Sequence, residues 1–148
     1  MRNAVVVDTS LAIKWILEEP DSDKADILLV EWSKKRKEIL VPALLIYEIA
    51  NALFQNVRNG EITLERAKEA LAQLLRKKLK VDFPRTPDLG IRAIELTHSF
   101  SLQATYDPHF LALAEREGCE LWTADKRMWR VVKDQLDWVH WLGDYSAP

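Results

Sequence analysis

Four carboxylates are the side chains of this chain best suited to chemistry: Asp8, Glu48, Asp107 and Asp125. Asp8 and Asp125 each follow a short apolar run that is typical of a buried strand, and Asp107 begins a helical pattern. In a parallel α/β sheet, ligands bind beyond the carboxyl ends of the strands, where helix N-termini also point. We therefore expect Asp8 and Asp125 to lie at the same edge of one sheet.

Glu48 belongs to a different kind of element, a helix that is expected to begin near Pro42. With about 100° of rotation per residue, one face of this helix is apolar and faces the core. That face is formed by Leu45, Ile49, Ala52 and Leu53. Glu48 lies on the neighbouring stripe with Asn51, so its carboxylate borders the core and needs either a cation partner or a metal ion.

Carboxylates that gather at one site repel one another and raise one another's pKa unless a cation neutralises them. A site with only oxygen ligands favours magnesium or manganese over zinc or copper. Such an ion polarises a phosphoryl oxygen and lowers the pKa of a bound water. The four acids are therefore predicted to be both metal ligands and catalytic residues, in a site that can hydrolyse a phosphodiester without a protein nucleophile.

Each acid also has a simpler explanation when it is considered alone. Asp8 and Asp125 can be helix N-caps or turn residues, Asp107 before Pro108 has the pattern of an N-cap, and Glu48 can be a solvated helix residue. These explanations leave open whether the four side chains meet, which is what the metal hypothesis requires.

The elements that would position these acids alternate between short apolar strands and amphipathic helices. The strands are expected at residues 4–7, 39–41, 81–83, 120–123 and 138–142. The helices are expected at residues 11–17, 21–37, 42–58, 63–76, 88–100, 107–117 and 125–133. This alternation predicts a parallel sheet covered on both faces, in one domain spanning residues 1–148.

Composition excludes several classes of protein. The net charge of -2 lacks the basic excess that nucleic-acid binders usually carry, so an RNA substrate would need a metal ion and a local basic patch. The single cysteine, Cys119, excludes an intrachain disulfide, and no Cys/His zinc spacing, phosphate loop or Gly-x-Ser-x-Gly elbow occurs. No apolar stretch has the length of a signal peptide or a membrane span, so we expect a cytoplasmic protein without membrane contact.

Four segments in this order and spacing resemble the PIN domain family, in particular VapC-type toxin ribonucleases. The segments are residues 5–10 (VVVDTS), 47–53 (YEIANAL), 106–114 (YDPHFLALA) and 121–127 (LWTADKR), and the resemblance extends over residues 5–142. It implies a Rossmann-like three-layer fold, with a central, mostly parallel sheet flanked by helices. It also implies a magnesium- or manganese-dependent endoribonuclease that acts on RNA, forms homodimers and is paired with a VapB-type antitoxin in a type II toxin–antitoxin system.

The resemblance also assigns roles to individual residues. Asp8, Glu48, Asp107 and Asp125 match the family's acidic positions by their place in the segments. Ser10 and Thr123 match its supporting hydroxyls, which orient the metal ligands, and Asn51 is a further candidate for that role.

Pro108 departs from the family pattern, in which a small residue such as alanine follows the third acid. Proline pushes the residue before it out of helical geometry. We therefore expect Asp107 to be an N-cap or first-turn residue with a displaced carboxylate, and Thr105 is the alternative cap.

Three cations near the inferred site are candidates for contact with substrate phosphates: Lys14, Lys126 and Arg127. Most of the six tryptophans are expected in the core, with Trp15 and Trp129 as candidates for a surface that binds a second copy or the antitoxin.

Two other functions remain open. A phosphohydrolase acting on small molecules could use a strand-end Asp as nucleophile, although Ser10 stands where haloacid-dehalogenase-like enzymes need a second Asp. A PIN-like module without catalysis could bind only RNA or protein.

Overall fold

The computed structural model describes residues 2–148, which surround a central sheet of five parallel strands. The strands are β1 (Ala4–Val7), β2 (Glu38–Pro42), β3 (Leu79–Asp82), β4 (Glu120–Thr123) and β5 (Val139–Trp141). Their order across the sheet is β3-β2-β1-β4-β5. The chain therefore builds outward on one side of β1 and then returns to build on the other side.

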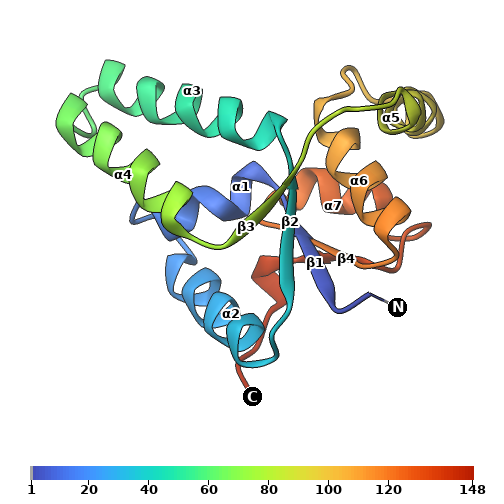
Figure 1. Cartoon of the computed structure of the whole chain (residues 1–148), viewed down its shortest axis with the longest axis horizontal. Coiled ribbons are helices and arrows are strands. Elements are labelled where there is room, and N and C mark those ends of the chain that lie inside the picture. Colours follow the sequence, from blue (N-terminus) through green and yellow to red (C-terminus); the bar gives the residue numbers. More distant parts are fainter. Residues whose placement is uncertain (1) are drawn as a thin grey trace.

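Helices connect these strands and cover both faces of the sheet. They are α1 (Thr9–Ala12), α2 (Ser22–Lys34), α3 (Leu44–Arg58), α4 (Leu64–Arg76), α5 (Asp88–Ser99), α6 (Tyr106–Glu117) and α7 (Lys126–Val132), with short 3-10 turns at Ile13–Trp15 and Leu142–Asp144. Figure 1 shows α2 and α4 on one side of the sheet and α5 and α6 on the other, while α3 and α4 run side by side. This arrangement confirms the predicted three-layer, Rossmann-like α/β fold.

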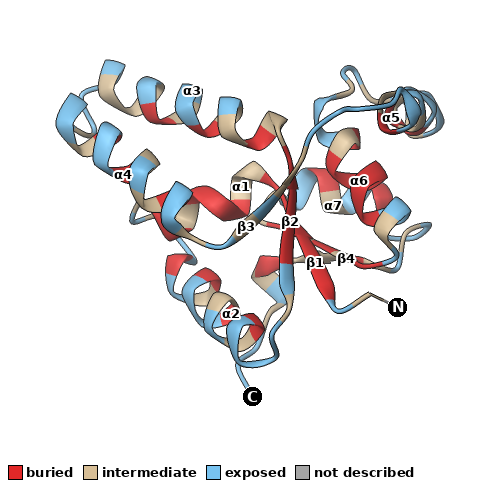
Figure 2. Cartoon of the chain, viewed as in Figure 1, coloured by how far each residue is buried: buried red, intermediate tan, exposed pale blue. Residues whose placement is uncertain are grey.

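The hydrophobic core lies on both faces of the central strand. All four residues of β1 are buried, because helices cover this strand from both sides. Residues 110–114 of α6 are also buried, since this helix packs between the sheet and α5 (Figure 2). Cys119 is buried just before β4, as an apolar position would be. Of the helices among residues 2–148, none combines the length and the apolar character that crossing a lipid bilayer requires.

Two predicted element boundaries were wrong near the far edge of the sheet. Pro42 is the last residue of β2, where it pairs with Asp82 of β3, and α3 begins only at Leu44. Proline is tolerated there because the ladder continues through the Ala43 amide, which donates to the Asp82 carbonyl at 3.0 Å. The third strand begins at Leu79, because it must align with β2 from Ile39 onward.

The helix expected at residues 11–17 is shorter and starts earlier. Asp8 caps it, so helical geometry begins at Thr9, and the chain tightens into a 3-10 turn after Ala12. The helix expected at residues 21–37 ends at Lys34. The other predicted helices and β4 lie within about two residues of their observed positions.

Candidate metal centre

The candidate site lies between the adjacent strands β1 and β4. At this point the chain stops adding strands on one side of β1 and begins to add them on the other. The register pairs Val7 with Trp122, and this places Asp8 beside Thr123 at the carboxyl ends of the two strands. The Asp8 amide donates to the Trp122 carbonyl at 3.3 Å. In open α/β sheets this switch point is the usual location of a ligand site.

Asp8 is the one charged side chain among the buried residues of 2–148, with 4% of its surface exposed. Its Oδ1 accepts hydrogen bonds from the Ser10 hydroxyl at 2.6 Å and from the Leu11 amide at 3.2 Å, and its Oδ2 accepts one from the Thr123 hydroxyl. Asp8 is therefore the N-cap of α1 and also a buried carboxylate at the strand edge.

The two hydroxyls that hold Asp8 also fix the loop after β4. Ser10 Oγ accepts the Ala124 amide and Thr123 Oγ1 accepts the Asp125 amide, each at 2.9 Å. Asp125 in turn caps α7, where its Oδ1 accepts the Met128 amide at 3.1 Å. Ser10 and Thr123 thus occupy the positions that an orienting role requires, since they link the first acid to the last.

Glu48 approaches the site from α3 and is half-buried, beside the core face as predicted. The Thr9 hydroxyl donates to Glu48 Oε1 at 2.7 Å. Sequence reasoning missed Thr9, although its position directly after Asp8 was the signal that could have identified it. Asn51 lies exposed one turn beyond Glu48.

Asp107 lies inside the first turn of α6, with Thr105 as the backbone N-cap residue. The N-cap interpretation of Asp107 was therefore wrong and the first-turn alternative is confirmed. Pro108 is buried and fits there because the first turn of a helix leaves its amide groups without intrahelical partners.

Electrostatics connect Asp107 with the other three acids. Burial raises the pKa of Asp8 from its ordinary 3.8 to about 7; its hydrogen bonds lower this pKa and the charge of Asp107 raises it. Burial likewise raises the pKa of Glu48, the Thr9 hydrogen bond opposes this, and the charge of Asp107 adds to it. The pKa of Asp107 is raised by desolvation and then by the charge of Asp125. The charge of Asp107 therefore acts on Asp8 and Glu48, while the charge of Asp125 acts on Asp107.

The donor set fits a hard divalent cation. All donors are carboxylate oxygens, and none of the ion pairs formed by residues 2–148 involves any of these four acids. Three of them lie at helix N-termini, whose dipoles favour negative charge. Within residues 2–148, however, no three acidic, histidine or cysteine side chains already form a set that could hold an ion. The acids are close enough to shift one another's pKa without forming a closed ligand cage.

The cations expected to contact substrate differ in position. Lys14 donates to Glu19 Oε1 at 3.2 Å and to the Pro20 carbonyl at 2.8 Å, so its ammonium is engaged in holding a turn. Lys126 and Arg127 are exposed at the start of α7, directly after Asp125.

Trp15 is buried and its indole N–H donates to the Ala25 carbonyl at 2.9 Å, so its expected role on a partner surface was wrong.

A comparison with models of known protein families shows to which family this chain belongs. The PIN domain family model matches residues 5–134, which include all four acids. This chain belongs to the PIN domain family. Two curated relatives come from Pyrobaculum aerophilum. Exonuclease VapC9 is 27% identical over 72% of this chain and 77% of its own length, and ribonuclease VapC3 is 29% identical over 84% and 91%.

Solved structures of PIN-type proteins share the fold. A Pyrobaculum aerophilum protein superimposes with a TM-score of 0.66 at 24% identity, covering 93% of this chain and 83% of its own. VapBC-1 from nontypeable Haemophilus influenzae matches with a TM-score of 0.61 at 14% identity, covering 93% and 96%. At these identities the likeness concerns the fold, and it agrees with the PIN assignment made from the sequence.

Proposed function

We propose that this PIN domain is a VapC-type ribonuclease that hydrolyses RNA phosphodiester bonds as an endonuclease with a bound magnesium or manganese ion. The observation that carries the proposal is a group of acids linked through the charge of Asp107, which includes the buried Asp8 and forms none of the ion pairs found among residues 2–148. The names of the VapC relatives, an exonuclease and a ribonuclease, support nucleic-acid hydrolysis.

In this proposal Asp8, Glu48, Asp107 and Asp125 hold the ion. When bound, the ion supplies Lewis-acid polarisation of a phosphoryl oxygen and acidifies a water molecule. Ser10 and Thr123 keep both Asp8 oxygens in place, and Thr9 does the same for Glu48. Lys126 and Arg127, exposed beside Asp125, bind phosphate oxygens of the RNA and align its backbone with the carboxylates.

The phosphohydrolase alternative finds less support in this geometry. Both oxygens of Asp8 already accept hydrogen bonds and the side chain is buried, which leaves little room for attack on a phosphoryl group. The same three contacts are compatible with a metal ligand, because Oδ2 accepts one hydrogen bond and keeps a second lone pair.

Cleavage assays with matched variants test the proposal. The wild-type protein should cut single-stranded RNA in magnesium or manganese buffer and stop when the ion is chelated. Asp8→Asn and Asp125→Asn should lose cleavage and manganese binding by calorimetry while keeping a native circular dichroism spectrum. Asp23→Asn, at an exposed acid of α2 outside the site, is the control and should remain active. Full cleavage by both site variants would overturn the assignment.

We further propose a VapB-type antitoxin as the protein partner and a homodimer as the assembly. The structure of VapBC-1 supports a partner of this type. Large apolar side chains exposed on α3 and α4 offer a surface for protein contact. They are Tyr47, Phe54, Leu64 and Leu75. Light scattering of the purified chain should give twice the monomer mass, and a monomer at micromolar concentration would contradict the dimer.

A further inference from the structure

Trp141 is an aromatic side chain that core packing does not explain. It ends β5, where it pairs with Thr123 at the same carboxyl edge as the acidic residues. Trp122, Trp129 and Trp138 all pack against the hydrophobic core, whereas the half-buried Trp141 lies outside it. The half-buried indole therefore keeps part of its surface open to solvent at the edge of the sheet that carries the candidate site.

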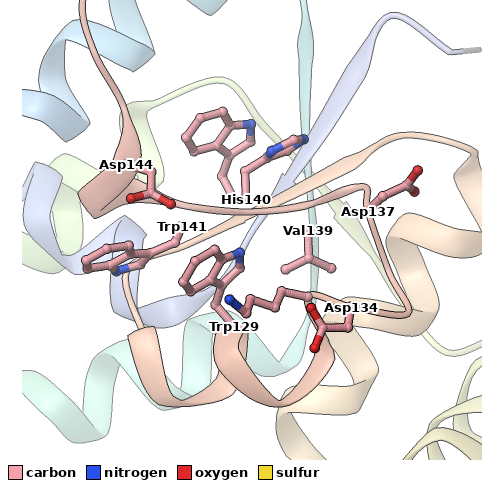
Figure 3. A pocket seen from close by; sticks show the side chains of 9 residues that line it. Trp129, Asp134, Asp137, Val139, His140, Trp141 and Asp144 are labelled. Carbon is pink, nitrogen blue, oxygen red and sulfur yellow. The ribbon is translucent and has the colours of Figure 1, made fainter.

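The indole of Trp141 is packed in a defined position. It stacks on Trp129 with ring centroids 5.5 Å apart and an angle of 26° between the planes (Figure 3). On another side it lies against Gly143, where an added Cβ would come within 2.1 Å of the ring. Lys24 fixes this backbone by donating to the Gly143 carbonyl at 3.0 Å. The absence of a side chain at position 143 is therefore what makes room for the indole.

Cations flank the stacked pair of tryptophans. Lys126 Nζ lies 4.6 Å from the ring centroid of Trp141, and Lys133 Nζ lies 4.9 Å from that of Trp129. Residues 126–133 contain four cations and no acid, although the whole chain has a net charge of -2. A basic helix with stacked aromatic rings is the combination that binds single-stranded nucleic acid.

We propose that Trp141 is the platform on which a base of the RNA stacks, next to the phosphate that is cut. This inference rests on the proposed ribonuclease function. Lys126 follows Asp125 directly, so a phosphate bound by Lys126 lies beside the carboxylate site. Stacking of a base displaces the exposed Lys126 ammonium from the indole face, and the ammonium then pairs with the phosphate.

Acidic residues on the rim of the neighbouring hollow restrict the path of the RNA backbone. Asp144 lies near Trp141, and Asp134 and Asp137 lie at the other end of a hollow of about 410 Å³ (Figure 3). These carboxylates repel phosphates, so the RNA backbone runs on the side of α7 that carries the lysines. A flexible single strand satisfies this path better than a rigid duplex, because its bases can turn out and stack.

Binding of fluorescently labelled single-stranded RNA, measured by anisotropy in chelator, tests the platform. Trp141→Ala should weaken binding about tenfold, whereas Trp141→Phe should retain most of it. Trp138→Phe, at a tryptophan of the same segment that packs against the core, is the control and should bind as wild type. In cleavage assays Trp141→Ala should raise KM about tenfold with little change in kcat, since stacking binds substrate and transition state alike.

Oligonucleotides with single abasic positions separate stacking from a folding defect. With wild-type protein, one abasic position next to the cut site should reduce affinity about tenfold, and Trp141→Ala should not reduce it further. Unchanged RNA binding by Trp141→Ala overturns the platform while the ribonuclease proposal stands. Unchanged RNA binding with an altered oligomeric state also overturns it and assigns this face to a protein contact. Wild-type protein that neither binds nor cuts RNA overturns the proposed function itself, and this inference with it.

Discussion

Replacing Asp8 with asparagine should stabilise the metal-free protein at alkaline pH, while it removes one of the proposed metal ligands. The folded protein holds the Asp8 proton up to about pH 7, whereas the unfolded chain releases it near 3.8. Between these values the unfolded state binds fewer protons than the folded state. The free energy of unfolding therefore falls as pH rises from about 4 to about 7, and then levels off.

The size of this effect follows from the two pKa values. At about 1.4 kcal/mol per pH unit, a rise from 3.8 to about 7 costs the ionised fold about 4 kcal/mol. Asparagine avoids this cost but has one oxygen where the carboxylate has two, and the lost acceptor costs about 2 kcal/mol. The net gain above pH 8 is about 2 kcal/mol, or roughly 4–8 °C in Tm for a chain of this size.

Thermal unfolding in chelator, followed by circular dichroism from pH 5 to pH 8.5, measures the difference between Asp8→Asn and wild type. It should be near zero or negative at pH 5 and should grow as pH rises. Added manganese should raise the Tm of wild type only. A variant less stable than wild type by the same amount at every pH would show that burial does not raise the Asp8 pKa, and would refute the reasoning.

Three further variants probe other links in the structure. Asp107→Asn should lower the pKa of Asp8 and Glu48, because it removes the charge that acts on both, and should weaken manganese binding in calorimetry. Thr9→Val removes the donor to Glu48, so manganese affinity near pH 6.5 should fall about tenfold while the fold is kept. Gly118→Ala should cost about 1 kcal/mol in urea unfolding; an added Cβ meets nothing within 4 Å, so the cost would come from the positive φ of 61°.

The sheet edge could be predicted because its signals are local. A short apolar run followed within two residues by a carboxylate indicates both a buried strand and its carboxyl end, and this located Asp8 and Asp125 without any knowledge of strand order. The start of the edge strand β3 was predicted two residues too late, because lysines at positions 78 and 80 obscure its alternation of apolar and polar residues. Its boundaries follow from pairing with β2, which is information from outside the segment.

Contacts between distant segments were beyond sequence reasoning for a different reason. Thr9 and Glu48 are 39 positions apart, and their hydrogen bond depends on how α3 packs over α1. The packing of the Trp141 indole likewise depends on Gly143, Trp129 and Lys24, which belong to three separate segments. Neither the spacing nor the types of these residues distinguish them from ordinary core and surface positions.

Asp107 shows how a local rule can be right while its consequence is misjudged. The rule that proline excludes helical geometry before it weakened the expectation that Asp107 reaches the metal. In the structure α6 begins one residue earlier, at Tyr106, so Asp107 and Pro108 both lie in the first turn, where a missing amide costs no intrahelical bond. That placement puts the Asp107 carboxylate at the positive end of the helix dipole, and its charge raises the pKa of Asp8 and Glu48. Pro108 therefore helps to fix the start of the helix that carries Asp107.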